Sequence, residues 1–374
     1  MKKIFYLVVF ILTVLIGIKL FYKNSYQDKI AQMIMVGFDG LTLTPENPIY
    51  RDIRKNHIGG VILFNQKGWD KNTQRNIKDP DQLKNLIKQL QQISNIPLFI
   101  AIDQEGGKVA RLSPEFGVST YTAGELGQMN DLTITQREAD KTSSVLKNLG
   151  INVNFAPCVD ITLNSNSIIK FKDRAFSDND AQIVVMHAEQ FIKAYQKVGV
   201  LPVLKHFPGH GSATGDTHEG YVDITNEYQS VELEPYQILL PKYPEIGVMV
   251  AHVFNRHVDT ENPLSLSYQN VTKNLKEDLH FKGIIFSDDL QMGALTKRHS
   301  WHDIVVKAIN AGNDVLVIGN NLTYDPDIAD KTLKIILKAL KDGEIKPERI
   351  DEAYDKIMKT KSKFLKDYHV DRKN

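Results

Sequence analysis

The chain has 374 residues, of which 42% are hydrophobic, so it can bury one large core or two small ones. Its 46 basic and 45 acidic side chains nearly cancel, which leaves no strong field to attract nucleic acid or an acidic lipid surface. We therefore expect no nucleic-acid partner. The single cysteine, Cys158, excludes an intramolecular disulfide.

The first 24 residues have the pattern of a membrane signal. Lys2 and Lys3 precede a largely apolar segment, Ile4–Tyr22, and a span of about 20 residues is enough to cross the hydrocarbon core. No small-x-small cleavage site follows, so we expect an uncleaved transmembrane signal-anchor over residues 1–24 with its basic end in the cytoplasm. The domain of residues 25–374 is then extracytoplasmic and membrane-anchored; secretion after signal cleavage is the alternative.

From about residue 26 onward, eight short runs rich in Val and Ile alternate with amphipathic stretches. Nearly continuous hydrophobicity is typical of parallel strands that are covered on both faces. This alternation predicts the α/β class and a single (β/α)₈ TIM-type barrel. The expected strands are Ile30–Phe38, Ile58–Phe64, Pro97–Asp103, Val153–Ile161, Val200–Phe207, Ile246–Val253, Lys282–Asp289 and Asn313–Gly319.

The amphipathic stretches predict the helices that cover such a barrel, and two of them follow the last strand. The expected helices are Asp81–Ser94, Thr135–Leu149, Ala181–Lys197, Tyr268–Leu279, Ala329–Lys341 and Lys346–Leu365.

Polar or ionisable side chains lie at or near the ends of most of these strands. One such residue would be ordinary, but several together indicate a shared site, because barrel enzymes place their chemistry at the C-terminal rim of the strands. The rim residues are Asp103, Asp160, Lys205, His206, His252 and Asp288.

A glycine-rich loop follows Lys205 and His206 and ends at Asp216 and His218. Glycine restricts φ little, so this loop can move. A carboxylate near an imidazole fixes its tautomer and raises its pKa, which suits His218 to donate and accept a proton near neutral pH. An isolated Asp-x-His is usually a turn with a surface histidine; its position after the rim residues favours an acid/base pair.

Two acidic residues close the seventh expected strand. Asp288, at its end, could attack an anomeric carbon and form a glycosyl-enzyme. A helix N-cap is the alternative role for an aspartate here, and we assign it to Asp289 more readily.

Sugar-binding candidates lie at the end of the third expected strand and on the loops after the third and fourth. Asp103 could accept hydrogen bonds from paired hydroxyls, and Arg111 could reach the same pocket. Arg174 lies on the long loop after the fourth strand. Taken singly, either arginine could equally be a surface charge.

Five segments together resemble the bacterial, peptidoglycan-recycling β-N-acetylhexosaminidases of glycoside hydrolase family 3. They are IDQEGGKVARL, NFAPCVDI, DRAF, KHFPGHG with its following Asp-x-His, and IIFSDDLQMGA. The resemblance runs from about residue 28 to about residue 320, in the family's order. KHFPGHG with Asp-x-His is the most specific of the five.

The resemblance implies a retaining exo-β-N-acetylglucosaminidase that needs no metal or other cofactor. It makes Asp288 the nucleophile, His218 the acid/base and Asp216 its partner. It implies N-acetylglucosamine-containing oligosaccharides or muropeptides as substrates. The positions that match the family's sugar-binding residues are Asp103, Arg111, Arg174, Lys205 and His206.

Three positions depart from the family's pattern: Lys108 stands where arginine is common, Val222 where proline is common, and the sixth strand continues unusually as His252–Arg256. These departures leave open the preference for the leaving group and the rigidity of the loop.

Other functions remain open at this point. The histidines His206, His210, His218 and His252, with Asp103 and Asp288, could instead hold the metal of a metal-dependent hydrolase. A Schiff-base lyase using Lys205, a non-catalytic sugar-binding protein, and phosphorolysis in place of hydrolysis are further alternatives.

Overall fold

The structure, a computed structural model, describes residues 26–366. Eight parallel strands form one sheet in the order β10-β1-β2-β5-β6-β7-β8-β9. The sheet nearly closes on itself, because the Ser287 amide donates to the Val315 carbonyl at 3.0 Å and Leu290 to Val317 at 2.9 Å. The predicted α/β barrel is thereby confirmed. Its strands are β1 (Ile34–Gly37), β2 (Gly60–Ile62), β5 (Phe99–Ile102), β6 (Val153–Asn154), β7 (Leu201–Phe207), β8 (Gly247–Val250), β9 (Ile284–Ser287) and β10 (Leu316–Ile318).

All eight predicted strands exist, but most are shorter than their hydrophobic runs. The run Ile30–Phe38 begins as helix, since residues 26–32 are helical and the strand starts only at Ile34. The run Val153–Ile161 keeps two strand residues, because Pro157 lacks an amide hydrogen and cannot continue a ladder. Hydrophobicity predicted burial at these positions correctly and overestimated the length of regular pairing.

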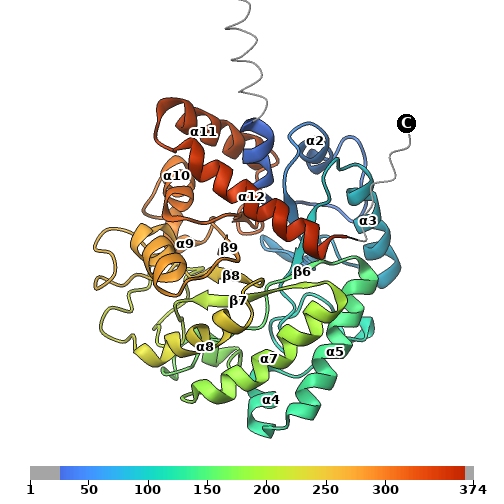
Figure 1. Cartoon of the computed structure of the whole chain (residues 1–374). Coiled ribbons are helices and arrows are strands. Elements are labelled where there is room, and N and C mark those ends of the chain that lie inside the picture. The colour runs from blue at the N-terminus through green and yellow to red at the C-terminus, as the bar shows by residue number, and fades with distance from the viewer. Residues whose placement is uncertain (1–25, 367–374) are drawn as a thin grey trace, which may run out of the picture.

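Helices surround the strands (Figure 1). All six predicted helices are present within a few residues, Tyr268–Leu279 as a π-helical segment. The helices are α2 (Pro48–Arg54), α3 (Pro80–Gln92), α4 (Ala123–Met129), α5 (Leu132–Leu149), α6 (Ile168–Phe171), α7 (Ala181–Val198), α8 (Glu234–Lys242), α9 (Gly293–Thr296), α10 (Trp301–Ala311), α11 (Ile328–Asp342), α12 (Pro347–Phe364) and the π-helical η4 (Gln269–Asp278), with short 3₁₀ turns η1 (Pro114–Phe116), η2 (Ser230–Leu233) and η3 (Leu264–Leu266).

The ends of the long helices are set by local residues. Asp131 begins α5 by accepting hydrogen bonds from the amides of Thr133 and Ile134, and Gly150 ends it in the left-handed conformation at φ 90°. Such caps satisfy backbone groups that a helix leaves without partners.

The sequence did not predict a small antiparallel hairpin that follows β2. It consists of β3 (Gln66–Lys67) and β4 (Asp70–Gln74). The hairpin is mostly exposed and polar, so it lacks the alternating hydrophobic pattern by which a strand is predicted.

The last helix lies across the N-terminal end of the barrel (Figure 1). From α12, Arg349 donates to the carbonyl of Asn313 at 2.7 Å, and Lys361 donates to the carbonyl of Gly59 at 2.8 Å. Both acceptors precede strands, so α12 covers the end opposite to the predicted site.

The predicted membrane segment Ile4–Tyr22 lies outside the described residues. Within residues 26–366, no helix combines the length and hydropathy needed to span a bilayer.

Candidate active site

Five charged side chains form a largely buried network above the ends of β5 and β7. The Lys205 Nζ bridges two carboxylates, at 2.8 Å from Asp103 Oδ1 and 2.7 Å from Glu105 Oε1. Arg174 binds Glu105 through two hydrogen bonds, 2.9 and 2.7 Å long. Arg111 donates to the other oxygen of Asp103 at 3.1 Å. The network therefore presents fixed donors and acceptors at the barrel mouth.

The network keeps its members charged. Burial alone would raise the pKa of Asp103, but Lys205 and Arg111 outweigh it and hold that pKa well below its usual range. Likewise, Arg174 and Lys205 outweigh the burial of Glu105 and lower its pKa to about 2. The same carboxylates raise the pKa of Lys205 against the effect of burial. Buried charges persist only with such compensation.

His206 lies beside this network and is oriented by Asp160. The His206 Nδ1 lies 2.7 Å from Asp160 Oδ2, and its Nε2 lies 3.1 Å from Arg174. The other oxygen of Asp160 accepts the backbone amides of His206 and His210 at 3.2 and 3.0 Å. Asp160 thus fixes both a ring and the start of the following loop.

Asp288 and Asp289 occupy different environments after β9. Asp289 accepts the amides of Gln291 and Gly319 at 3.0 and 2.8 Å, so it closes a turn and ties two loops together. It is not the N-cap of α9, which is Met292; that alternative was wrong because the chain makes a further turn before the helix starts. Asp288 accepts the neighbouring amide of Asp289 at 2.8 Å.

The electrostatic surroundings of Asp288 favour its ionised form. Burial opposes ionisation, but electrostatic interactions with His252, His206 and His218, together with the hydrogen bond from the Asp289 amide, lower the pKa of Asp288. His252 is itself fixed, since its Nδ1 lies 2.6 Å from Ser265 Oγ and its Nε2 lies 3.0 Å from the Asp289 carbonyl.

Asp216 and His218 form a pair on the glycine-rich loop, with His218 Nδ1 2.7 Å from Asp216 Oδ1. Burial would lower the pKa of His218, but the Asp216 hydrogen bond and the charge of Asp288 raise it. Because Nδ1 faces Asp216, Nε2 is the nitrogen available to another molecule. The His218 side chain is 52% exposed, as a proton donor to an incoming ligand must be.

The loop is anchored at both ends. At its start, Glu232 accepts the amides of Gly211 and Ser212 at 2.9 and 3.1 Å. At its end, the carbonyl of His218 accepts the amide of Gly293 at 3.2 Å, on the segment that follows Asp288. The pair is therefore docked against the segment that carries Asp288.

The structure brings the predicted rim residues of β5, β6, β7, β8 and β9 to one end of the barrel. Glu105 and Glu232 were not predicted as site residues, and His210 was considered only as a ligand of the alternative metal site. Glu105 could have been found from its position two residues after Asp103, between a strand end and the turn at Gly106. Glu232 carries no comparable pattern, because its role depends on contacts between separate loops.

The predicted metal ligands do not gather as one set. Among the described residues, one group has donor atoms close enough to hold an ion: Cys158, Asp160 and His206. These atoms already bond to one another, since Cys158 Sγ donates to Asp160 at 3.2 Å. Burial also raises the pKa of the Cys158 thiol well above its usual value, which disfavours the thiolate that metals require.

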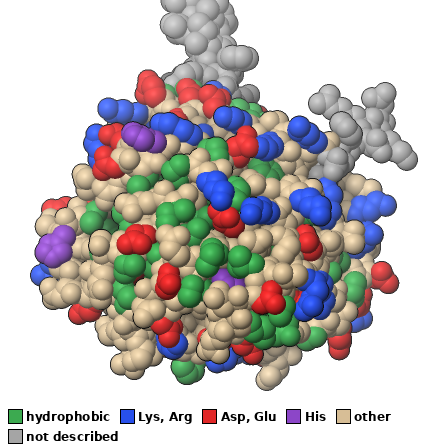
Figure 2. All heavy atoms as spheres, turned by 60° about the horizontal axis from the view of Figure 1, so that its bottom comes forward, with side chains coloured by type: hydrophobic (Ala, Val, Ile, Leu, Met, Phe, Trp, Pro, Cys, Tyr) green, Lys and Arg blue, Asp and Glu red, His purple; other side chains and the backbone are tan. Residues whose placement is uncertain are grey.

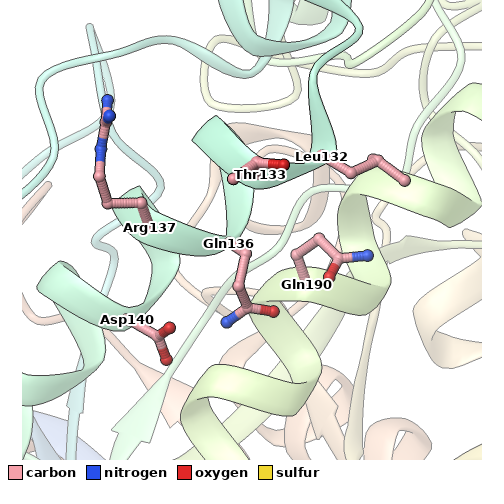
Figure 3. A pocket seen from close by; sticks show the side chains of 6 residues that line it. All are labelled: Leu132, Thr133, Gln136, Arg137, Asp140 and Gln190. Carbon is pink, nitrogen blue, oxygen red and sulfur yellow. The ribbon is translucent and has the colours of Figure 1, made fainter.

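A separate depression of about 560 Å³ lies on the outer surface between α5 and α7 (Figure 3). The residues that line it are Leu132, Thr133, Gln136, Arg137, Asp140 and Gln190. It contains none of the clustered, oriented groups found at the strand ends, so we place the chemistry at the barrel mouth.

The face shown in Figure 2 carries hydrophobic, acidic and basic side chains side by side.

One known protein family matches most of this chain. A sequence profile of the glycosyl hydrolase family 3 N terminal domain matches residues 25–360. The chain belongs to glycosyl hydrolase family 3. The predicted membership of this family is thereby confirmed.

Relatives in family 3 carry hexosaminidase names. The beta-hexosaminidase of Nitrosomonas eutropha is 33% identical over 80% of this chain and 83% of its own length. Beta-hexosaminidase A of Pseudoalteromonas piscicida is 30% identical over 86% of this chain, which spans only 56% of that relative. The structure of a family 3 beta-N-acetylglucosaminidase from a Paenibacillus species matches with a TM-score of 0.81 and 30% identity, over 91% of this chain and 63% of that one.

Proposed function

We propose that this family 3 protein is a retaining exo-β-N-acetylglucosaminidase. The observation that carries the proposal is the docking of the Asp216–His218 pair, by the Gly293 amide, onto the segment that follows Asp288. This arrangement sets a proton donor beside a carboxylate held in its ionised form. The names of the relatives support the acetamido sugar as substrate.

In the first step, a carboxylate oxygen of Asp288 bonds to the anomeric carbon as the glycosidic C–O bond breaks. His218 Nε2 gives its proton to the departing oxygen. Asp103, Arg111, Arg174, Lys205 and His206 hold the hydroxyl and acetamido groups of the sugar.

In the second step, His218 takes a proton from water, and the water oxygen bonds to the anomeric carbon. The bond to Asp288 breaks, and the sugar leaves with its configuration retained. Asp216 stabilises the imidazolium that forms and fixes the tautomer of His218.

Two rival functions fit the site less well. A lysine that forms a Schiff base must be neutral to attack a carbonyl, whereas Asp103 and Glu105 raise the pKa of Lys205. A purely sugar-binding protein would have no use for an exposed histidine oriented by a carboxylate beside a second, ionised carboxylate.

The physiological substrates in this proposal are fragments of peptidoglycan that end in N-acetylglucosamine. The apolar segment Ile4–Tyr22, preceded by Lys2 and Lys3, supports a location at the outer face of the membrane, where such fragments arise.

The test is hydrolysis of an aryl β-N-acetylglucosaminide by the wild type, Asp288→Ala and His218→Ala, with His302→Ala on α10 as control. We expect release by the wild type and the control, none from Asp288→Ala, and release slowed about 10²-fold or more in His218→Ala. Full activity of Asp288→Ala would contradict the mechanism. Hydrolysis of the matching β-glucoside in place of the acetamido sugar would contradict the specificity.

A further inference from the structure

A pair of aromatic rings, one exposed and one partly buried, lies at the barrel rim, apart from the charged network and the glycine-rich loop. Trp69, at the tip of the β3–β4 hairpin, is 44% exposed. Its ring centroid lies 5.2 Å from that of Tyr324, on the loop after β10, with the planes tilted by 35°. A single exposed aromatic side chain is ordinary, but two aromatic rings from separate loops in contact with each other form an apolar patch, and such patches often mark a binding site.

The two loops that carry these rings are held together by specific contacts. The amide of Gly68 donates to Asn321 Oδ1 at 2.9 Å. Arg75, which is fully buried, donates to the carbonyl of Asn320 at 2.7 Å. Its guanidinium also lies 5.5 Å from the Trp69 ring. The hairpin is therefore a supported platform.

The platform is joined to the segment of the proposed nucleophile. Asp289, next to Asp288, accepts the Gly319 amide at 2.8 Å. Gln291 Oε1 accepts the Asn320 amide at 2.6 Å. Since Asn320 also binds Arg75, a continuous series of hydrogen bonds connects the loop after β9 to the hairpin.

The strand order indicates which part of a substrate would meet this platform. The charged groups proposed to hold the terminal sugar lie at the ends of β5 and β7, and β5 lies across the barrel from β9. A sugar held there with its anomeric carbon at Asp288 directs its leaving group away from β5, toward the loops after β9 and β10. The loop after β10 carries Tyr324, and its Asn321 binds the hairpin.

Polar groups border the platform. Lys67 Nζ lies 2.8 Å from Asp39 Oδ2, and both side chains are partly exposed. The same Nζ lies 5.7 Å from the Trp69 ring centroid. An aromatic ring can pack against the apolar face of a sugar, and a nearby donor and acceptor can bond the hydroxyls at the edge of that sugar. This combination suits a carbohydrate ligand.

We propose that Trp69 and Tyr324 form the subsite for the leaving-group sugar, with Lys67 and Asp39 bonding its hydroxyls. This rests on the proposed function, because it assumes that Asp288 attacks the terminal sugar. The subsite selects substrates whose leaving group is a second sugar ring over those with a small leaving group.

The test measures kcat/KM of the full-length protein on two substrates. One is N,N′-diacetylchitobiose, whose leaving group is a sugar; the other is the β-glycosyl fluoride of N-acetylglucosamine, whose leaving group is one atom. For Trp69→Ala we expect kcat/KM on the disaccharide to fall about five- to tenfold, because alanine leaves the apolar face of the leaving sugar exposed to water. The value on the fluoride should not change, and Trp69→Phe should recover most of the activity on the disaccharide. Tyr268→Ala, an aromatic of similar exposure on the segment after β8, is the matched control.

An equal fall on both substrates would overturn the proposal, because it would show that Trp69 only supports the fold. Unchanged values on both would overturn it as well. Failure of the proposed function looks different: the wild type would then hydrolyse neither substrate.

Discussion

Asp288 and Asp289 are neighbours in the chain, but their surroundings separate their properties. Burial raises the pKa of Asp289 to about 6, although two backbone amides partly offset it. Three histidines lower the pKa of Asp288 against the same burial. Asp289 is bonded into a turn, whereas Asp288 stays ionised beside His218. Pairs of carboxylates with divergent environments are a common mark of divided roles at an active site.

The pH dependence of the reaction should report the pair Asp216–His218. In Asp216→Asn, the amide oxygen can still accept a hydrogen bond from His218, but the carboxylate charge that helps to raise the pKa of His218 is gone, so His218 loses its proton at lower pH. We expect the basic limb of kcat/KM to move to lower pH and the maximal value to fall about 10²-fold. Asp223→Asn, beyond the pair in the same loop region, is the control. A basic limb at the same pH in Asp216→Asn would show that another group is the acid.

At the scale of elements, the sequence predicted which residues the glycine-rich loop carries but not where the loop docks. Asp216 and His218 were recognisable by type and spacing. Gly293 was not, because its role is visible only when the segment after β9 lies against the loop. Its importance is steric: an added Cβ would lie 2.8 Å from the His218 carbonyl oxygen and 2.9 Å from the backbone of Glu219.

We therefore expect Gly293→Ala to displace the loop and lower kcat about 10²-fold, since small misplacements of catalytic groups cost that much. Binding of free N-acetylglucosamine should change little, because the residues proposed to hold it lie on β7 and on the loops after β5 and β6. Gly220→Ala is a matched control on the loop itself, with no heavy atom within 4 Å of the added Cβ. Steady-state kinetics and a binding titration check both points. Equal kcat in the two variants would show that catalysis does not depend on the docking of the loop.

At the scale of the whole molecule, the sequence predicted the barrel because eight hydrophobic runs in alternation with helices allow few other folds. It did not predict the β3–β4 hairpin, which is polar, nor the brevity of β6, which Pro157 imposes. The candidate site, too, was predictable in part. Residues at strand ends, such as Asp103 and Lys205, were predictable from the fold, whereas contacts between loops were not.

The two ends of the described chain meet at a buried lysine. Lys361 of α12 is 3% exposed and donates to Gln32 Oε1 at 2.7 Å and to the Gly59 carbonyl at 2.8 Å. Neither acceptor is charged, and burial lowers the pKa of Lys361 to about 7. The unfolded chain, in which this pKa is near its ordinary value, therefore binds more protons between about pH 7 and 10.

The contribution of Lys361 to stability must accordingly rise with pH across that window and be least favourable below pH 7. Lys361→Met removes this cost, so its Tm relative to the wild type should be highest near pH 7 and should decrease as the pH rises toward 10. Thermal unfolding at several pH values measures the difference, with Lys359→Met, exposed on the same helix, as the control. A pH-independent difference would mean that the two hydrogen bonds keep Lys361 charged throughout, and that α12 closes the barrel with a buried ammonium group.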